Sequence, residues 1–229
     1  QSRDIERIKN ALPVWQKYIP DLYEDVLEKK KEAKLMTGTG FLINKDGYLL
    51  TNTHVINQCK TIKIRKKFID IEPYLVATDA INDVALLKVP SLNRNPGTKF
   101  SFGPAPLGDE IIVAGFPLQG YLSSQLNVTT GTVSALAGPN NDTRLAQITA
   151  PVQVGNSGGP VINKAGNIVG MIVSKLNARK MLKLTGDIPQ NVNFVIKHNI
   201  LKAFLETHGV TYEQSLANLE KKNPQIAQI

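Results

Sequence analysis

The sequence predicts an all-β core with helical segments at both ends. From Thr37 to about Ile196 it consists of short apolar runs separated by Gly, Pro, Asn and Asp, the pattern of strands joined by turns. The run "GFLINKDGYLLTNTHVI" places two apolar stretches around Asp46-Gly47, which is a strong hairpin signal. The flanking segments instead show helix caps followed by helical spacing of apolar residues.

The N-terminal residues 4–35 are predicted to be helical. Asp4 can cap a first segment, which Pro13 and Pro20 interrupt. Asp21 can cap "LYEDVLEKKKEAKL", whose acidic residues come early and whose lysines come late, as the helix dipole favours. Its apolar stripe can dock on its own domain or pair with another chain, and both readings stay open.

The strand-rich region divides into two similar halves. Strands are expected at "TIKIR", "IEPYLVAT" and "VALLKVP" before a connector over residues 90–108, and at "EIIVAGFP", "LNVTTGTVSAL" and "RLAQITA" after it. "PVINKAGNIVGMIVSKL" then repeats the pattern of the first hairpin, because Asn163 to Gly166 corresponds to Asn44 to Gly47. "NVNFVI" is one more strand.

Two helices are expected at the C-terminal end. "HNILKAFLETHG" is typical of a helix ended by Gly209. Thr211 and Gln214 form a capping box, which predicts a last short helix from Tyr212 to about Lys222.

Composition narrows the class of protein. With 229 residues, 42% apolar and 20% charged, the chain is typical of a globular protein. It has no apolar run near the roughly 18 residues that span a bilayer. The net charge of +8 suggests nucleic acid or anionic membrane, but the lysine clusters at 29–34 and 63–67 lack interleaved aromatics, so we expect no specific nucleic-acid site. Because the chain starts without Met or an apolar signal, we expect that an N-terminal targeting segment was removed.

The stretch "QVGNSGGP" holds Ser157 in a flexible glycine frame. A serine attacks a carbonyl only if a base takes its proton and donors stabilise the oxyanion. Of the three histidines, His198 and His208 fall on the C-terminal helix, whereas His54 ends the first hairpin. An acid must then orient the imidazole. Asp83 begins the apolar strand "VALLKV", and Asp79 is its competitor.

"TNTHVI", "DVALLKV" and "GNSGGP", in the order His–Asp–Ser with spacings of 29 and 74 residues, resemble the trypsin/chymotrypsin-fold serine peptidases. The likeness is closest to the bacterial HtrA (Deg-type) branch and to stand-alone trypsin-like peptidases without a PDZ domain. It continues through "TTGTVSAL", "GNIVGMIVSKL" and "QNVNFVIK", so it covers about residues 37–207. The α/β-hydrolases fit poorly, because in them the nucleophile precedes its His in sequence.

The resemblance implies a fold and its boundaries. It implies two six-stranded antiparallel β-barrels in double Greek-key order, over about residues 36–100 and 105–196, within a peptidase domain of residues 36–208 that a helix over about 197–208 closes. Residues 1–35 would be a helical N-terminal extension, and residues 209–229 a short helix and tail.

The resemblance also implies roles for residues. Ser157 would be the nucleophile, His54 the general base, and Asp83 the orienting carboxylate. The oxyanion hole would be the turn Gly155, Asn156 and Ser157, with the N–H groups of Gly155 and Ser157 as donors. Gly155 can turn its peptide without a Cβ in the way.

Two departures from the digestive enzymes concern activation and specificity. Asn156 stands where those enzymes have an aspartate that pairs with a new N-terminus, so that activation is not expected. Pro151 stands at the pocket floor in place of an acid, so we expect cleavage after small or medium aliphatic residues. The substrate would add a strand along the edge at about Ser174 to Leu176. The residues expected to bind substrate are Pro151, Val154, Ser174, Lys175, Leu176, Asn193 and Phe194.

The prediction is therefore a serine endopeptidase that hydrolyses peptide bonds in proteins or peptides through an acyl-enzyme, with no metal or cofactor. The alternatives are a latent or silent binding module of the same fold, and a basic protein that binds nucleic acid or a membrane surface. We expect a homo-oligomer through the N-terminal helix to be possible. A periplasmic or secreted bacterial location is expected, with the cytoplasm as the alternative.

Overall fold

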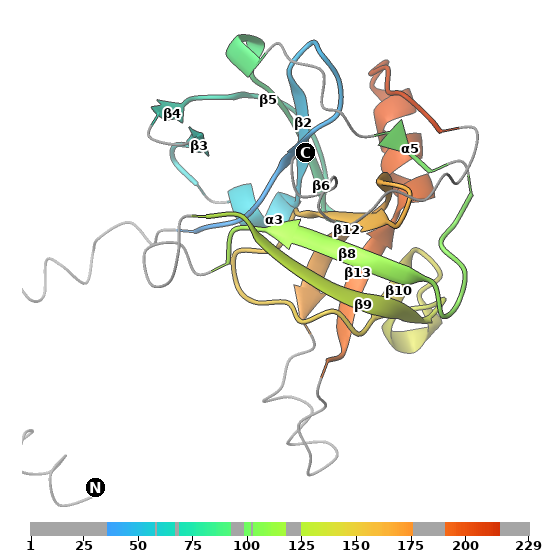
Figure 1. Ribbon diagram of the computed structural model, residues 1–229. Helices are drawn as coiled ribbons and strands as arrows, with labels where there is room; N and C mark the ends of the chain where they lie inside the picture. Colours follow the sequence, from blue (N-terminus) through green and yellow to red (C-terminus); the bar gives the residue numbers. More distant parts are fainter. Residues whose placement is uncertain are drawn as a thin grey trace, which may run out of the picture. The chain divides into compact units, whose positions relative to one another are not determined.

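The computed structural model describes residues 36–57, 59–66, 69–92, 99–101, 103–117, 125–175 and 191–215. The predicted helical extension over residues 1–35 and the tail beyond residue 215 lie outside the described residues. The described chain forms two β-rich halves with a C-terminal helix beside them (Figure 1).

The first half contains a sheet, a separate hairpin and one short helix. Its four-stranded sheet has the order β1-β2-β6-β5, and among the described strands β3 pairs only with β4. The elements are β1 (Phe41–Leu42), β2 (Tyr48–Thr51), α3 (Thr53–Ile56), β3 (Ile64–Lys66), β4 (Ile69–Ile71), β5 (Tyr74–Asp79) and β6 (Val84–Lys88).

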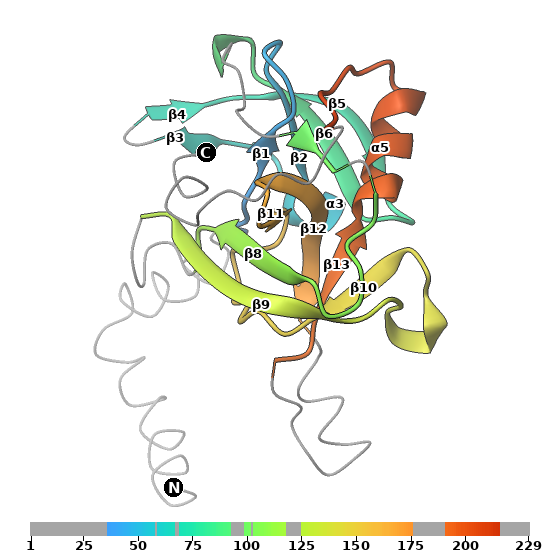
Figure 2. The same ribbon diagram turned by 45° about the vertical axis from the view of Figure 1, so that its right-hand side comes forward.

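The second half is a closed barrel. Following the pairings β8-β9-β10-β13-β12-β11 returns to β8, so six antiparallel strands close on themselves, and β7 adds a parallel pairing to β12 (Figure 2). The elements are β7 (Lys99–Phe100), β8 (Glu110–Gly115), β9 (Asn127–Ala135), β10 (Leu145–Ile148), β11 (Pro160–Asn163), β12 (Asn167–Lys175), β13 (Asn193–Lys197) and α5 (His198–Thr207).

The sequence predicted two six-stranded barrels, and the described residues close only one. In the first half, β1 has two residues and β3 and β4 have three each, which gives too few ladder bonds to carry the sheet around. Pro73 between β4 and β5 also has no N–H to donate to a ladder.

The two hairpins that repeat in the sequence also repeat in structure. Gly47 and Gly166 both have a left-handed φ, +81° and +80°, which a side chain rarely adopts. In both turns the first Asn caps the loop: Asn44 Oδ1 accepts from Asp46 N–H at 3.0 Å, and Asn163 Oδ1 accepts from Asn167 N–H at 3.0 Å. The sequence echo therefore marks equivalent turns in the two halves.

One apolar core joins the halves. β2 and β6 alternate, so Leu50 and Leu86 face a cluster shared with the second half, while Leu49 and Leu87 face a small cluster of the first half. The barrel interior is filled separately by aliphatic side chains of β8 to β13. The halves are therefore packed on each other. The shared cluster includes Phe41, Phe100, Met171, Ile196, Leu201, Phe204 and Leu205.

The helix predicted to begin at Tyr212 does not begin there. Phe100 N–H donates to Glu213 O at 2.8 Å and Phe100 O accepts from Ser215 N–H at 2.8 Å, so this segment runs extended beside β7. The Tyr212 ring also packs edge-on against Phe100, with centroids 5.0 Å apart. These tertiary contacts prevail over the local capping signal. The helix α5 does end as predicted, since Gly209 takes a φ of +66°.

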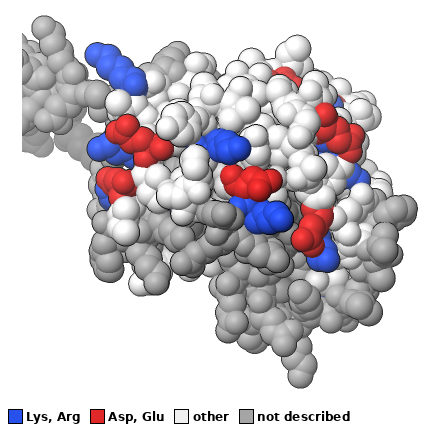
Figure 3. Space-filling view, turned by 90° about the horizontal axis from the view of Figure 1, so that it is seen from above, with Lys and Arg blue, Asp and Glu red and all other residues white. Residues whose placement is uncertain are grey.

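Charges of both signs are mixed on the described surface. Figure 3 shows acidic groups beside basic ones on one face. Within the second lysine cluster, Arg65 makes a two-point pair with Asp70 at 2.8 and 3.1 Å. No helix among the described residues is long and apolar enough to cross a membrane.

Candidate active site

His54 and Asp83 are joined at two points. The chain leaves β2 at Asn52 and turns into α3, which carries His54 in its first turn. The His54 N–H donates to Asp83 Oδ1 at 2.8 Å, and the ring Nδ1 lies 2.6 Å from Asp83 Oδ2. A carboxylate only accepts, so the ring proton belongs on Nδ1 and Nε2 keeps a free lone pair. The pair is thus arranged for His54 to take a proton at Nε2.

Asp83 reaches this position through a strained backbone. Its φ is +56°, a left-handed value that non-glycine residues seldom take. Its carbonyl is held by Asn52, which is fully buried and donates from Nδ2 at 2.9 Å, and by Thr53 N–H at 3.3 Å. The surrounding contacts therefore impose the conformation that presents the carboxylate to His54.

Asp79, the competing acid, has a different task. Its carboxylate accepts hydrogen bonds from Ile81 N–H at 2.9 Å and Asn82 N–H at 3.0 Å, closing the turn before β6. Asp79 is therefore a turn residue, and Asp83 is the acid beside the imidazole.

The loop before Ser157 is a tight turn closed by a hydrogen bond. Asn156 N–H donates to Gln153 O at 3.1 Å, and Gly155 at the third position has a φ of +99°. This combination is the signature of a type II turn, whose central peptide is flipped relative to a type I turn. Among the described residues, no acceptor takes the N–H of Gly155 or of Ser157.

Asn156 was predicted to lie in the oxyanion-hole turn without donating to it. Its N–H is used in the turn bond to Gln153. Its side chain is 3% exposed, and a Cβ added at Gly115 would come within 2.5 Å of Asn156 Oδ1. The N–H groups of Gly155 and Ser157, the two predicted donors, have no acceptor among the described residues.

The segments that carry His54 and Ser157 meet at residues 38–39. Thr39 N–H donates to Ser157 O at 2.8 Å. A Cβ at Gly38 would lie 2.5 Å from the Val55 side chain and 3.2 Å from Ser157 O, so this glycine is squeezed between the two segments. The structure gives no hydrogen bond between the Ser157 hydroxyl and the His54 ring within its described part; such bonds are often loose without substrate.

The backbone after Ser157 is equally crowded. Gly158 has a φ of +83°, and a Cβ there would fall 2.2 Å from Thr39 O and 2.4 Å from Thr51 Oγ1. Its N–H donates to Ile172 O at 2.9 Å, which anchors the loop on β12. Only glycine fits this position.

The predicted substrate-binding residues differ in their solvent exposure. Asn193 and Phe194 are buried at the start of β13, and Asn193 Nδ2 donates to Ala150 O at 2.7 Å. Pro151 is exposed, and Val154 is 69% exposed, so Val154 forms no packed wall in this structure. The backbones of Ser174 and Lys175 pair with those two residues of β13, and Leu176 lies outside the described residues.

Residues 38–171 match the family described as "Trypsin-like peptidase domain". The chain belongs to the trypsin-like peptidase family. It is 47% identical over 184 residues to the uncharacterized protein y4bJ of Sinorhizobium fredii, covering 80% of this chain and 29% of that protein. It is 35% identical over 148 residues to a probable periplasmic DegP-like serine endoprotease of Pseudomonas fluorescens, covering 63% and 30%.

Among solved structures, the chain is similar to the serine endoprotease of Yersinia pestis. The TM-score is 0.61 at 26% identity, covering 75% of this chain and 57% of that one. The chain spans about a third or less of the length of the two curated relatives. The similarity therefore concerns the peptidase domain.

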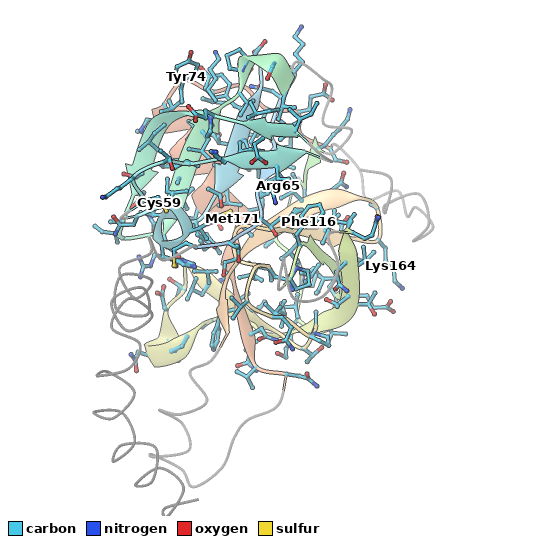
Figure 4. All side chains as sticks on the ribbon, turned by 90° about the vertical axis from the view of Figure 1, so that its left-hand side faces the viewer. Cys59, Arg65, Tyr74, Phe116, Lys164 and Met171 are labelled. Carbon is cyan, nitrogen blue, oxygen red and sulfur yellow. The ribbon has the colours of Figure 1, made fainter. Side chains whose placement is uncertain are left out.

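Two features of this trypsin-like domain were missed in the sequence. Thr39 Oγ1 donates to Gly155 O at 2.7 Å and accepts from Phe116 N–H at 3.0 Å, so one hydroxyl ties the turn before Ser157 to the end of β8. Figure 4 shows Phe116 at the level where the halves meet. The two glycines around Thr39 were a usable signal of close backbone approach. Arg144, the second feature, contacts the turn before Asp83 and had no local signal.

Proposed function

We propose that this protein is a serine endopeptidase with Ser157 as nucleophile, His54 as general base and then acid, and Asp83 as the orienting carboxylate. The observation that carries the proposal is the two-point bond between His54 and Asp83, at 2.8 and 2.6 Å. Such a bond fixes the tautomer in which Nε2 can take the serine proton.

The proposed reaction has two halves. The Ser157 oxygen attacks the substrate carbonyl while its proton moves to His54 Nε2, and the oxyanion is stabilised by the N–H groups of Gly155 and Ser157. The protonated imidazole then gives that proton to the leaving amine, and an acyl-enzyme remains. Water, deprotonated by the same nitrogen, releases the acid. Support for this hole comes from the left-handed Gly155 and from the two N–H groups without an acceptor in the described chain.

The proposed specificity is for small or medium aliphatic side chains before the cleaved bond. Among the described residues predicted to bind substrate, Pro151, Val154 and Phe194 are apolar, and the amide of Asn193 is committed to Ala150 O. The substrate backbone would pair along β12 at Ser174 and Lys175.

Cleavage of a peptide library tests this function. Purified protein should cut after Val, Ala or Leu, and both Ser157→Ala and His54→Ala should abolish cutting. Cleavage that survives Ser157→Ala would contradict the proposal. If both variants fold and the parent protein does not cleave the library, the alternative of a silent binding module is favoured.

We further propose a periplasmic or secreted location and self-association through residues 1–35. The location rests on the printed name of the Pseudomonas fluorescens relative, which describes that protein as periplasmic. Sedimentation of the full chain and of a version starting at Met36 tests self-association. If both proteins contain the same number of protomers per particle, a role for the N-terminal segment in self-association is refuted.

A further inference from the structure

The turn that precedes Asp83 is built around one carboxylate. Asp79 accepts the N–H groups of Ile81 and Asn82, and the Asn82 side chain also donates to it at 2.5 Å. Burial raises the pKa of Asp79, but these hydrogen bonds and the charge of Arg144 outweigh burial, so the pKa is lowered and the carboxylate stays ionised. The ionised Asp79 carboxylate therefore closes this turn, and the chain continues from the turn directly into Asp83.

Arg144 lies in the second half, immediately before β10, and its side chain reaches this turn. Its Nη1 donates to Ile81 O at 2.8 Å and to Asn82 Oδ1 at 3.2 Å. Its Nε and Nη2 donate to the two oxygens of Asp142 at 2.9 and 2.7 Å, which fixes the plane of the guanidinium. The planar fork of arginine can serve both partners at once, which a lysine ammonium cannot.

Among the described hydrogen bonds, those from Arg144 are the ones that hold Ile81 and Asn82 from another segment. The Ile81 side chain is 81% exposed. Residues 78–82 also border an open hollow of about 580 Å³ whose other wall is α5, so packed side chains do not cover them there. Other segments hold the two ends of the turn: the Thr53 hydroxyl donates to Asp79 O at 3.2 Å, and Asn52 Nδ2 and Thr53 N–H donate to Asp83 O.

We infer that Arg144 is a positioning residue for the Asp83–His54 pair: it clamps the Asp79–Asn82 turn from the second half and so, together with the bonds of Asn52 and Thr53 to Asp83 O, maintains the left-handed backbone that presents the Asp83 carboxylate. The inference rests on the proposed function for its catalytic consequence. The dependence of the His54–Asp83 bond on Arg144 can be tested whether or not the protein cleaves peptides.

Loss of the clamp should lower the catalytic rate. The strained φ of Asp83 persists only while neighbouring contacts impose it. When the clamp is removed, the carboxylate samples positions away from the ring, and small misplacements of catalytic groups cost up to about 100-fold in rate. Because Arg144 contacts the turn and not the proposed substrate strand β12, the loss falls on kcat and leaves KM unchanged.

The experiment compares Arg144→Met with Arg65→Met in the full-length protein. Arg65 is the matched control, because it also makes a two-point pair with a nearby aspartate, Asp70, on the separate β3–β4 hairpin. Arg144→Met should lower kcat by about 10- to 100-fold with KM within about twofold, and Arg65→Met should change neither. If Arg144→Met fails to fold, Asn82→Ala should give a smaller loss in kcat, because it removes one acceptor of the clamp, together with the side-chain bond to Asp79, and spares the Arg144–Asp142 pair.

A second readout separates this inference from the proposed function. The Nδ1 proton of His54, observed by nitrogen-edited NMR and assigned with His54→Ala, reports the bond to Asp83 whether or not the protein cleaves peptides. It should be a sharp downfield resonance in the parent and in Arg65→Met, and should broaden or disappear in folded Arg144→Met or Asn82→Ala. An unchanged resonance together with kcat within twofold of Arg65→Met would overturn the inference. A parent without cleavage would refute the proposed function alone, and the resonance would still decide the role of Arg144.

Discussion

Thr39 offers the sharpest test of how the turn before Ser157 is supported. Its side-chain hydroxyl donates to Gly155 O at 2.7 Å and accepts from Phe116 N–H at 3.0 Å, and the residue is 5% exposed. Thr39→Val keeps the shape and removes both bonds. Each buried group left without a partner costs about 1–3 kcal/mol, and two groups lose theirs, so the free energy of unfolding should fall by about 2–6 kcal/mol.

Thr39→Ser is the matched control. It keeps the hydroxyl and removes one methyl group, which is worth about 1 kcal/mol. The two variants therefore differ mainly in the two hydrogen bonds. Urea unfolding measures the free energies, and the rate of fluorophosphonate labelling measures the state of the turn.

Labelling should respond because the Gly155 carbonyl is no longer fixed. Losing one oxyanion donor outright costs about 10²–10³ in rate, so a loosened turn should lower the labelling rate of Thr39→Val by about 10-fold or more. Thr39→Ser should label at nearly the parent rate. If Thr39→Val is as stable as Thr39→Ser and labels as fast, the reasoning about this hydroxyl is refuted.

Three further predictions concern single residues. Asp83→Asn should keep the fold and lower kcat by about 10³- to 10⁴-fold, and a loss under tenfold in steady-state cleavage would contradict its role. Gly158→Ala should fold poorly, because its Cβ would fall 2.2 Å from Thr39 O; a melting temperature equal to the parent's would show that the loop relaxes freely. Burial, with the nearby charge of Lys202, lowers the pKa of His198 to about 4, so its ring binds a proton near pH 6.5 only when the chain unfolds. Stability should therefore fall by about 3 kcal/mol as pH drops from 6.5 to 4, and urea unfolding of His198→Phe should lack this loss; equal slopes in both proteins would refute it.

Local sequence signals predicted the hairpins and the contact of Asp83 with His54 because their determinants lie close together or follow strand periodicity. The Asn44–Gly47 turn is closed by its own side chain and glycine. Asp83 was favoured over Asp79 because an apolar strand follows it, and the structure places it 2.6 Å from His54.

What the sequence could not predict depends on distant partners. Thr39 meets Gly155 across 116 positions, and Arg144 meets Ile81 across 63. The capping box at Thr211 was locally sound, but pairing with Phe100 holds residues 213–215 extended. Closure of the first half was predicted from a resemblance, and the short described strands β1, β3 and β4 do not supply it.

The central claim is that Ser157 is a nucleophile activated by His54. Fluorophosphonate labelling followed by mass mapping of the modified peptide tests it most directly. Each chain should carry one label, on Ser157, and this label should disappear in His54→Ala. A label on another residue, or labelling of Ser157 that persists at the same rate in His54→Ala, would contradict it.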